Sequence, residues 1–326
     1  MDFKTLWIKS FFILLAVASG VWSRTGNQRP PAVVAESKAI EFLIREVPIW
    51  SKNNGCFSCH NNGDAARALY KAAQKGYSVP STALADTTSW AERPAVWEEN
   101  KGDPGFSDKR LANIQFASAL LAASEAGHVK DRRPLEVAAR RLAADQDADG
   151  AWKIDAGNTI GSPATYGAQL ATYMALRVLK KASLPDTAEA IKRAERWLNA
   201  SSPDNILAAA ALLLNSSGDS TEEARSKREQ CLKVLRGAQT SDGGWGPYAD
   251  SPPEPFDTAV VLIALAGIRR DPSIDGLIQR GRGFLAAQQN SDGSWPATTR
   301  PPGNDSYAQL MSTTGWATLA LLETRQ

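Results

Sequence analysis

A seven-residue pattern that occurs three times constrains the fold of this chain more than any other feature of its sequence. Gln146 to Trp152, Gln239 to Trp245 and Gln289 to Trp295 all read Gln-x-x-Asp-Gly-x-Trp. Four fixed positions in seven do not recur three times by chance, and self-similar segments are the signature of repeat architectures. The chain is therefore expected to consist of repeated structural units.

Hydrophobic periodicity predicts two kinds of helix around each copy of the pattern. The helix before it is amphipathic and charged, and the helix after it is small and apolar almost all round. An amphipathic helix lies at the surface, whereas a helix that is apolar all round is surrounded by protein. The outer helices are predicted at 134–144, 226–238 and 278–288, and the inner helices at 165–179, 257–268 and 307–322. Such hairpins, repeated around an axis, predict a double-walled, all-α toroid.

A fuller repeat signature extends this pattern towards the N-terminus of each unit. It consists of a basic residue, a small residue and an aromatic–aliphatic pair, followed by the Gln and the Gly-x-Trp. The complete match is Arg280, Gly281, Phe284, Leu285, Gln289, Gly293 and Trp295; first halves match at Arg193, Ala194, Trp197 and Leu198, and at Lys38, Ala39, Phe42 and Leu43. In this signature the chain resembles squalene–hopene cyclases, which share the α/α-toroid superfamily with protein prenyltransferases.

The resemblance implies a terpenoid cyclase-like toroid of six hairpins. They are expected at about 33–77, 83–128, 134–182, 187–218, 221–270 and 273–324, with the repeat signatures at 134–152, 226–245 and 278–295. In such folds the repeated Gln and Trp tie one outer helix to its neighbour. The alternative is that the Trp side chains line a cavity and stabilise a cation there.

The N-terminus reads as a targeting segment. Lys4 and Lys9 precede an apolar run over 11–22, which is the order of a signal peptide. This predicts a signal peptide at 1–23, a linker at 24–32 and a single toroid domain at 33–326, in a periplasmic or secreted protein. The alternative is an uncleaved membrane anchor. The net charge of +2, without long runs of one sign, argues against nucleic acid as a partner.

Cys56-Phe57-Ser58-Cys59-His60 is the Cys-x-x-Cys-His pattern of c-type haem attachment. Two thiols on about one helical turn can form thioethers with the two vinyl groups of one haem, and the adjacent imidazole ligates the iron. The alternatives are a Cys56–Cys59 disulfide, a redox dithiol or part of a zinc site. Cys231, in an outer-helix pattern, is expected to be a buried thiol.

The repeat predicts where this motif lies. Residues 38–43 match the start of a repeat and 64–75 read as an inner helix ending at Gly76. Cys56 to His60 therefore occupies the turn in which other repeats carry Gln-x-x-Asp-Gly-x-Trp, at the N-terminal rim of the inner helices. His128 lies at the far end of an inner helix and Met174 in the middle of one.

Met311 is the preferred sixth ligand of the iron, because a closed ring places the sixth hairpin beside the first. Met311 falls one turn into the sixth inner helix. Methionine ligation raises the reduction potential relative to histidine ligation. An open or water-ligated iron, with Met311 packed in the core, is the alternative.

The acid motif of the cyclases is incomplete. Squalene–hopene cyclases protonate an alkene with an acid inside Asp-x-Asp-Asp-Thr-Ala, and the matching segment here runs from Glu254 to Ala259. Phe256 stands where the resemblance requires the catalytic Asp, so whether the chain is an enzyme stays open. Glu254 and Asp257 are the remaining catalytic candidates, and Asp257 by itself is expected to be a helix N-cap. No constellation matches the zinc ligands of the prenyltransferases.

A calcium site is a further candidate. Asp145, Asp147 and Asp149, followed by Gly150, resemble the start of an EF-hand loop. Such a loop needs a bidentate Glu at its twelfth position, where this chain has Ala156. The default is an exposed acidic turn.

Three functions follow. The first is an exported haem protein that passes electrons to a redox partner, with Cys56 and Cys59 as anchors and His60 as proximal ligand. The second is an enzyme of the cyclase lineage that binds an isoprenoid or another apolar molecule in the central cavity. Its candidates are Asp257, Glu254, Tyr166, Tyr173 and Tyr307. The third is a non-catalytic toroid that binds a ligand or a protein and is braced by a Cys56–Cys59 disulfide.

Overall fold

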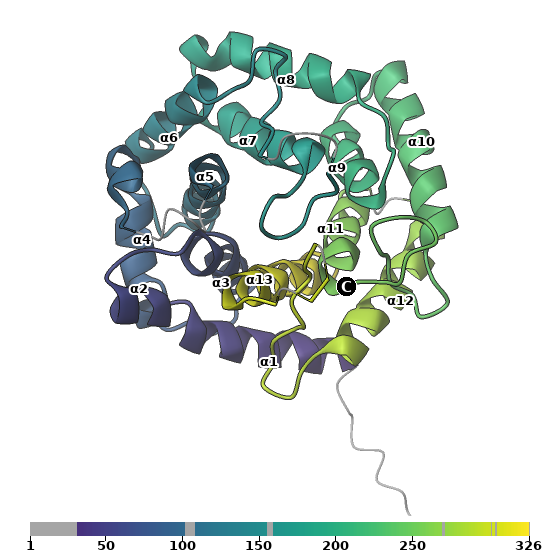
Figure 1. Ribbon diagram of the computed structural model, residues 1–326, viewed down its shortest axis with the longest axis horizontal. Helices are drawn as coiled ribbons and strands as arrows, with labels where there is room; N and C mark the ends of the chain where they lie inside the picture. The colour runs from purple at the N-terminus through teal and green to yellow at the C-terminus, as the bar shows by residue number, and fades with distance from the viewer. Residues whose placement is uncertain are drawn as a thin grey trace, which may run out of the picture.

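The computed structural model is a ring of helices with two walls (Figure 1). It describes residues 31–101, 108–154, 159–268, 271–300, 302–303 and 305–325, and contains no strand within them. The outer wall consists of α1 (Pro31–Glu46), α2 (Ile49–Asn54), α4 (Ala85–Ala91), α6 (Arg133–Ala144), α8 (Ala188–Ala200), α10 (Glu222–Ala238) and α12 (Pro272–Gln288). The inner wall consists of α3 (Ala66–Gln74), α5 (Lys109–Glu125), α7 (Ala168–Ala182), α9 (Ile206–Ser216), α11 (Pro255–Ala266) and α13 (Tyr307–Glu323).

The prediction of an all-α toroid of six hairpins is confirmed. Each hairpin passes from the outer wall to the inner wall. The second has the least regular outer part, because Pro94 cannot continue α4 and the chain goes on as the 3₁₀ turn η3 (Pro94–Glu99). Two further 3₁₀ turns are η2 (Ser81–Ala83) and η4 (Pro185–Thr187). The predicted signal peptide, and the linker up to residue 30, lie outside the described residues.

The repeated Gln and Trp have the structural role expected of them. Each Gln side-chain amide donates to a backbone carbonyl on the next outer helix, and each Trp indole donates to a carbonyl of the helix before it. The acceptors of Gln146, Gln239 and Gln289 are Ala190, Leu277 and Ala35, and those of Trp152, Trp245 and Trp295 are Leu142, Leu235 and Leu285. The third Gln reaches α1, so the last repeat closes the ring onto the first.

The glycine of each turn is required by a close approach between repeats. Gly150, Gly243 and Gly293 have φ of +99°, +89° and +100°, the region that favours glycine. A Cβ at Gly293 would collide with the Lys38 carbonyl oxygen on α1. The basic position of the next repeat therefore packs directly on the turn of the repeat before it.

The inner helices are buried, as their apolar composition predicts. α9, α11 and α13 are buried on nearly every side, including the polar residues Ser312, Thr313 and Thr314 of α13. α13 packs against α11 on one side and against the first hairpin on the other. In the described ranges, no helix combines the length and the apolar character needed to cross a bilayer.

Candidate functional site

The Cys-x-x-Cys-His motif lies where the first outer segment turns into the first inner helix. α2 ends at Asn54 and is capped by Gly55, whose φ is +63°, and Cys56 follows outside any helix. The Ser58 hydroxyl then caps a new helical run by accepting from the backbone N–H groups of His60 and Asn61. Cys59 and His60 open this run, which begins as the π-helix η1 (Cys59–Ala65) and continues as α3.

Two expectations about the motif are corrected by this geometry. The inner helix begins at Cys59 rather than at residue 64, and the two thiols do not share a helical turn, because Cys56 precedes the helix. The hydroxyl of Ser58 starts the helix early. Gly63 lets η1 lie close to α5, since a Cβ there would come within 2.9 Å of the Gln115 Cβ.

Two asparagines fix the backbone around the motif. The Asn61 side chain donates to the Glu46 carbonyl at 3.1 Å and to the Tyr307 hydroxyl at 3.0 Å. The Asn62 side chain accepts from the Ser58 N–H at 3.0 Å and donates to Thr87 at 2.8 Å. The motif is therefore attached to α1, α4 and α13 together.

His60 is at one end of a chain of buried polar groups. Its Nδ1 lies 2.7 Å from the Ser312 hydroxyl, which donates to the Asp64 carboxylate, also at 2.7 Å. Asp64 is fully buried and also accepts from Arg67 at 3.1 Å, from Gln115 at 2.7 Å and from the Tyr166 hydroxyl. The network joins the first, second, third and sixth hairpins at the N-terminal rim of the inner wall.

Burial sets the protonation of the motif. Removal from water lowers the pKa of His60, against the opposing pull of the Asp64 charge, so the imidazole is neutral at pH 7. Burial, and then the charge of Asp64, raise the pKa of the Cys59 thiol to about 12. Cys59 is therefore a thiol rather than a thiolate in the folded chain.

The three cysteines are free thiols, and all are buried. The Cys56–Cys59 disulfide considered from the sequence is thus not formed in this structure, and Cys231 is the buried thiol that was expected. Among the described residues, no three or more His, Cys, Asp and Glu side chains converge as ligands of one metal ion.

The candidates for a sixth ligand have separate positions. Met311 is fully buried in the core and directly precedes Ser312, the residue that contacts His60. Successive residues point about 100° apart around a helix, so the two side chains leave α13 in different directions. Met311 as a ligand stays a prediction, and Met174 is buried on α7.

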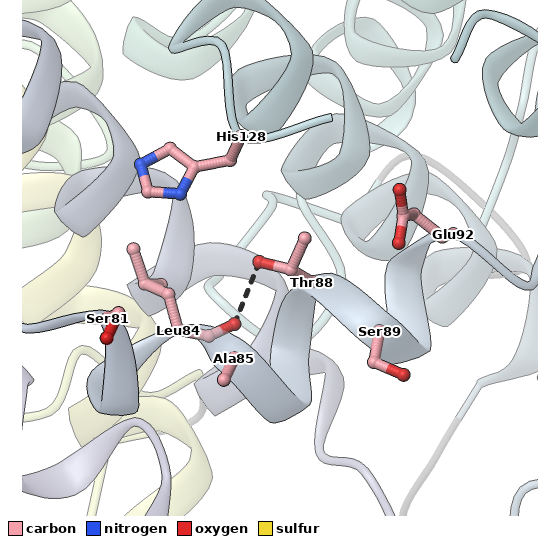
Figure 2. A pocket seen from close by; sticks show the side chains of 7 residues that line it. All are labelled: Ser81, Leu84, Ala85, Thr88, Ser89, Glu92 and His128. Atoms are coloured by element: carbon pink, nitrogen blue, oxygen red, sulfur yellow. Dashed lines mark hydrogen bonds between the residues drawn. The ribbon is translucent and has the colours of Figure 1, made fainter. Parts of the chain in front are cut away.

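His128 follows the C-terminus of α5, at the far end of an inner helix from the rim that holds His60. It is exposed and packs edge-on against Tyr70 at 5.2 Å between ring centroids. Figure 2 shows it across a surface hollow of about 290 Å³ from Leu84, Thr88 and Glu92. This hollow is separate from the motif.

Asp257 is not the N-cap of α11, contrary to the expectation from the sequence. Glu254 occupies the cap position without a capping side-chain bond, and Asp257 lies in the first turn of α11, fully buried. Arg300 donates to Asp257 and, at 2.7 Å, to Glu254. Burial raises the pKa of Asp257 to about 8, with Arg300 acting in the opposite direction and Glu254 adding to the rise. Asp257 Oδ1 has no hydrogen-bond partner among the residues that the structure describes.

Aromatic side chains cluster around Trp316 of α13. Tyr166 and Phe256 contact its ring edge-on at 5.6 Å and 5.8 Å between centroids, and Arg67 stacks over it at 4.5 Å. Tyr166 comes from the α6–α7 connection, which reaches into the ring (Figure 1), and has a φ of +62°. Below Arg67, at the C-terminal end of the inner wall, lies a hollow of about 60 Å³.

The other tyrosine candidates do not join Tyr166. Tyr307 stacks on Trp50 and donates to Glu46 at 2.9 Å, on the side of the motif. Tyr173 lies on α7 and packs against the core.

Sequence reasoning missed most of the buried network, because its members are far apart in the chain. Asp64 alone carried a signal, since it follows His60 by four residues and shares its helix face. Arg67, Gln115, Ser312 and Arg300 have no motif that marks them.

The acidic turn has three different sets of partners. Asp145 accepts from Asn113 at 3.1 Å, Asp147 from Arg110 at 2.9 Å, and Asp149 from Lys153. The carboxylates are engaged individually in this structure, and calcium binding stays a prediction.

Comparison with known proteins supports the fold more strongly than any activity. No family model matches the chain. The drimenyl diphosphate synthase of Streptomyces showdoensis is 36% identical over 95 residues, which are 28% of this chain and 17% of that protein. The match therefore spans less than a fifth of the relative's length.

Solved structures with the same fold include proteins of different classes. The type II terpene cyclase MstE from Scytonema aligns with a TM-score of 0.56 at 15% identity, over 90% of this chain and 98% of that one. A possible member of the GH105 family from Salmonella enterica aligns with a TM-score of 0.58 at 10% identity, over 96% and 98%. The chain has the α/α-toroid fold of type II terpene cyclases.

Proposed function

We propose that this toroid carries a covalent c-type haem on Cys56 and Cys59, with His60 as an axial ligand, and that it transfers electrons. The observation that carries the proposal is His60 itself, a buried, neutral imidazole with one ring nitrogen hydrogen-bonded and two unpaired cysteines beside it in the chain. A neutral imidazole is the form that ligates a metal. When bound, the haem would supply one-electron chemistry.

The donor set fits a macrocycle better than a single ion. Cys56 lies outside the helix that Cys59 and His60 begin, and these side chains do not converge on one point. A haem takes its two thioethers at the ring edge and its imidazole at the iron, so its three attachments are spread out. Tetrahedral zinc needs four donors at one centre.

The fold by itself does not select a reaction on isoprenoids. The same toroid occurs in a terpene cyclase and in a possible member of the GH105 family, both below 20% identity to this chain. Function follows from the site rather than from the fold.

The test is to express the full chain with the machinery that matures c-type cytochromes and to record a pyridine haemochrome spectrum after denaturation. We expect a c-type spectrum that survives denaturation, that is lost in Cys56→Ala/Cys59→Ala and that is kept in Cys231→Ala, the matched control. A chain without covalent haem, in a host that loads a reference cytochrome in parallel, would overturn the proposal.

A second candidate, an enzyme of the terpene cyclase lineage, is favoured by the comparisons and by Asp257. A carboxyl group with a pKa near 8 holds its proton at neutral pH, as an acid that protonates an alkene must. Structures of MstE contain geranylgeranyl dihydroxybenzoate as substrate. Phe256, at the position of the catalytic Asp, packs edge-on against Trp316, which Tyr166 also contacts, so an aromatic side chain stands where the acid would be needed.

This candidate predicts cyclised products from polyprenyl diphosphates or from geranylgeranyl dihydroxybenzoate, detected by mass spectrometry. Asp257→Asn should abolish them, whereas Asp250→Asn on the exposed α10–α11 connection should not. No conversion of either substrate class by folded protein counts against it.

A further inference from the structure

The hydroxyl of Ser312 stands between two groups that could each accept its one hydrogen. It lies 2.7 Å from His60 Nδ1 and 2.7 Å from Asp64 Oδ2. A serine hydroxyl has one proton to donate and two lone pairs with which to accept. Which neighbour receives the proton therefore determines what the other one must do.

Asp64 is the group that receives the hydrogen, because the other groups around its two oxygens are donors. Arg67, which can only donate, lies 3.1 Å from Oδ1, and Gln115 donates to Oδ2 at 2.7 Å. The Tyr166 hydroxyl donates to Oδ1 as well. A carboxylate without a proton of its own can only accept from Ser312.

We propose that Ser312 and Asp64 fix the tautomer of His60, so that Nδ1 carries the ring proton and Nε2 is the free ligand atom. With the Ser312 hydrogen directed at Asp64, the Ser312 oxygen presents a lone pair to the imidazole. Nδ1–H then donates to it, whereas an unprotonated Nδ1 would oppose two lone pairs at 2.7 Å. Ser312 and Asp64 are positioning residues for the imidazole.

The purpose of this arrangement rests on the proposed haem function. A ligating histidine commonly donates its second ring N–H to an oxygen acceptor, which orients the ring and makes the ligating nitrogen more basic. Here the acceptor is a serine of the last hairpin, backed by a carboxylate of the first. The tautomer itself can be tested without haem.

The experiment uses the full-length apoprotein, kept reduced and labelled with ¹⁵N-histidine, and reads the ring nitrogens by long-range ¹H–¹⁵N NMR at neutral pH. The chain has two histidines. His128 is exposed, with no hydrogen bond to a described residue, and serves as an internal reference for an unconstrained ring. We expect His60 to show a protonated Nδ1 and an unprotonated Nε2, and His128 to show an average of both forms.

Two variants distinguish the effect of the Ser312 hydrogen bonds from the effect of removing any buried hydroxyl. Ser312→Ala should release His60 to an averaged spectrum. Ser118→Ala, which removes a buried hydroxyl that has no hydrogen-bond partner in the described ranges, should leave His60 unchanged. In haem-loaded protein, Ser312→Ala should raise the midpoint potential relative to Ser118→Ala, because a less basic imidazole stabilises the oxidised iron less.

A wild-type spectrum with the proton of His60 on Nε2 overturns the proposal, and so does a Ser312→Ala spectrum identical to that of the wild type. If Ser312→Ala does not fold, the wild-type spectrum and Asp64→Asn decide. An amide at position 64 can donate to Ser312, which frees the hydroxyl to donate to His60 and should move the ring proton to Nε2. A fixed tautomer in a chain that never acquires haem would keep this inference and reject the haem function.

Discussion

Asp64 and Asp257 are both fully buried carboxyl groups on inner helices, but their surroundings differ. Within the described part of the chain, Asp64 has four donors, whereas Asp257 has Arg300 for one oxygen and no donor for the other. A buried carboxylate with few donors is disfavoured relative to its neutral acid. The ring therefore contains one carboxylate that is strongly solvated by protein and one that is poorly solvated.

The stability of the protein should therefore fall as the pH rises towards 8. The folded pKa of Asp257, about 8, lies above that of an unfolded Asp, so between about pH 4 and pH 8 the folded state holds a proton that the unfolded state lacks. The free energy of unfolding should decrease across this window by up to about 1.4 kcal/mol per pH unit. Urea titrations at several pH values measure this slope.

Asp257→Asn should flatten that slope, because the amide cannot titrate, and the exposed Asp250→Asn should not. A wild-type slope equal to that of Asp257→Asn would show that Arg300 keeps the carboxyl ionised at all these pH values.

At the scale of elements, the turn of each repeat is the contact that sets the spacing of the outer wall. The glycine of the turn lies against the backbone of the following outer helix, and the Gln bridges the same two elements. The contact is made of backbone atoms, so it cannot be relieved by a change of rotamer.

Gly293→Ala should accordingly lower the free energy of unfolding far more than Gly127→Ala does. Both glycines have positive φ, but a Cβ at Gly127 meets nothing within 4 Å, whereas one at Gly293 meets the Lys38 carbonyl. The control should lose about 1 kcal/mol from backbone strain alone. Gly293→Ala should lose at least about 2 kcal/mol more through forced separation of α12 and α1. Equal losses of unfolding free energy in the two variants, measured by chemical unfolding, would mean that α1 and α12 can move apart at little cost.

The helices of the two walls could be predicted from the sequence, because the spacing of apolar residues along a helix follows which of its faces are buried. The charged stretch at 226–238 and the apolar stretch at 257–268 lie close to α10 and α11 as observed. Of the site, only the part formed by residues adjacent in the sequence was predictable. Cys56, Cys59 and His60 were visible as a motif, but Ser312 contacts His60 across 252 positions and Arg300 contacts Asp257 across 43.

Local signals also failed where one side chain overrides a pattern. Ser58 caps a helix that begins at Cys59, five residues before the predicted start at Asp64, and this places Cys59 and His60 inside the helical run. Tyr166 takes a left-handed backbone that the sequence gives no reason to expect of an aromatic residue.

At the scale of the whole molecule, the ring is closed by contacts between its two ends. Arg325, after α13, lies 3.5 Å from Glu36 on α1, and Gln289 donates to the Ala35 carbonyl. The start of α1 and the end of α13 therefore lie near one another.

A circular permutant of residues 31–325 should fold. A short glycine–serine linker would join Arg325 to Pro31, and new ends would be opened between Gly218 and Asp219, which are exposed between α9 and α10. Thermal unfolding followed by circular dichroism should show one cooperative transition. A permutant opened inside the buried part of α13, between Met311 and Leu322, is the control and should not fold. Loss of cooperativity in the first permutant would show that the order of the hairpins matters beyond their contacts.

The position of Ser312 in the last hairpin has a consequence for the order in which the molecule is completed. A growing chain exposes Cys56, Cys59 and His60 long before α13 has been synthesised. An enzyme that acted on the thiols before α13 is in place would meet them on an open chain, while the imidazole is still unconstrained. The hydrogen bond between Ser312 and His60 can form only after α13 has packed against the first hairpin, so this part of the site is completed last.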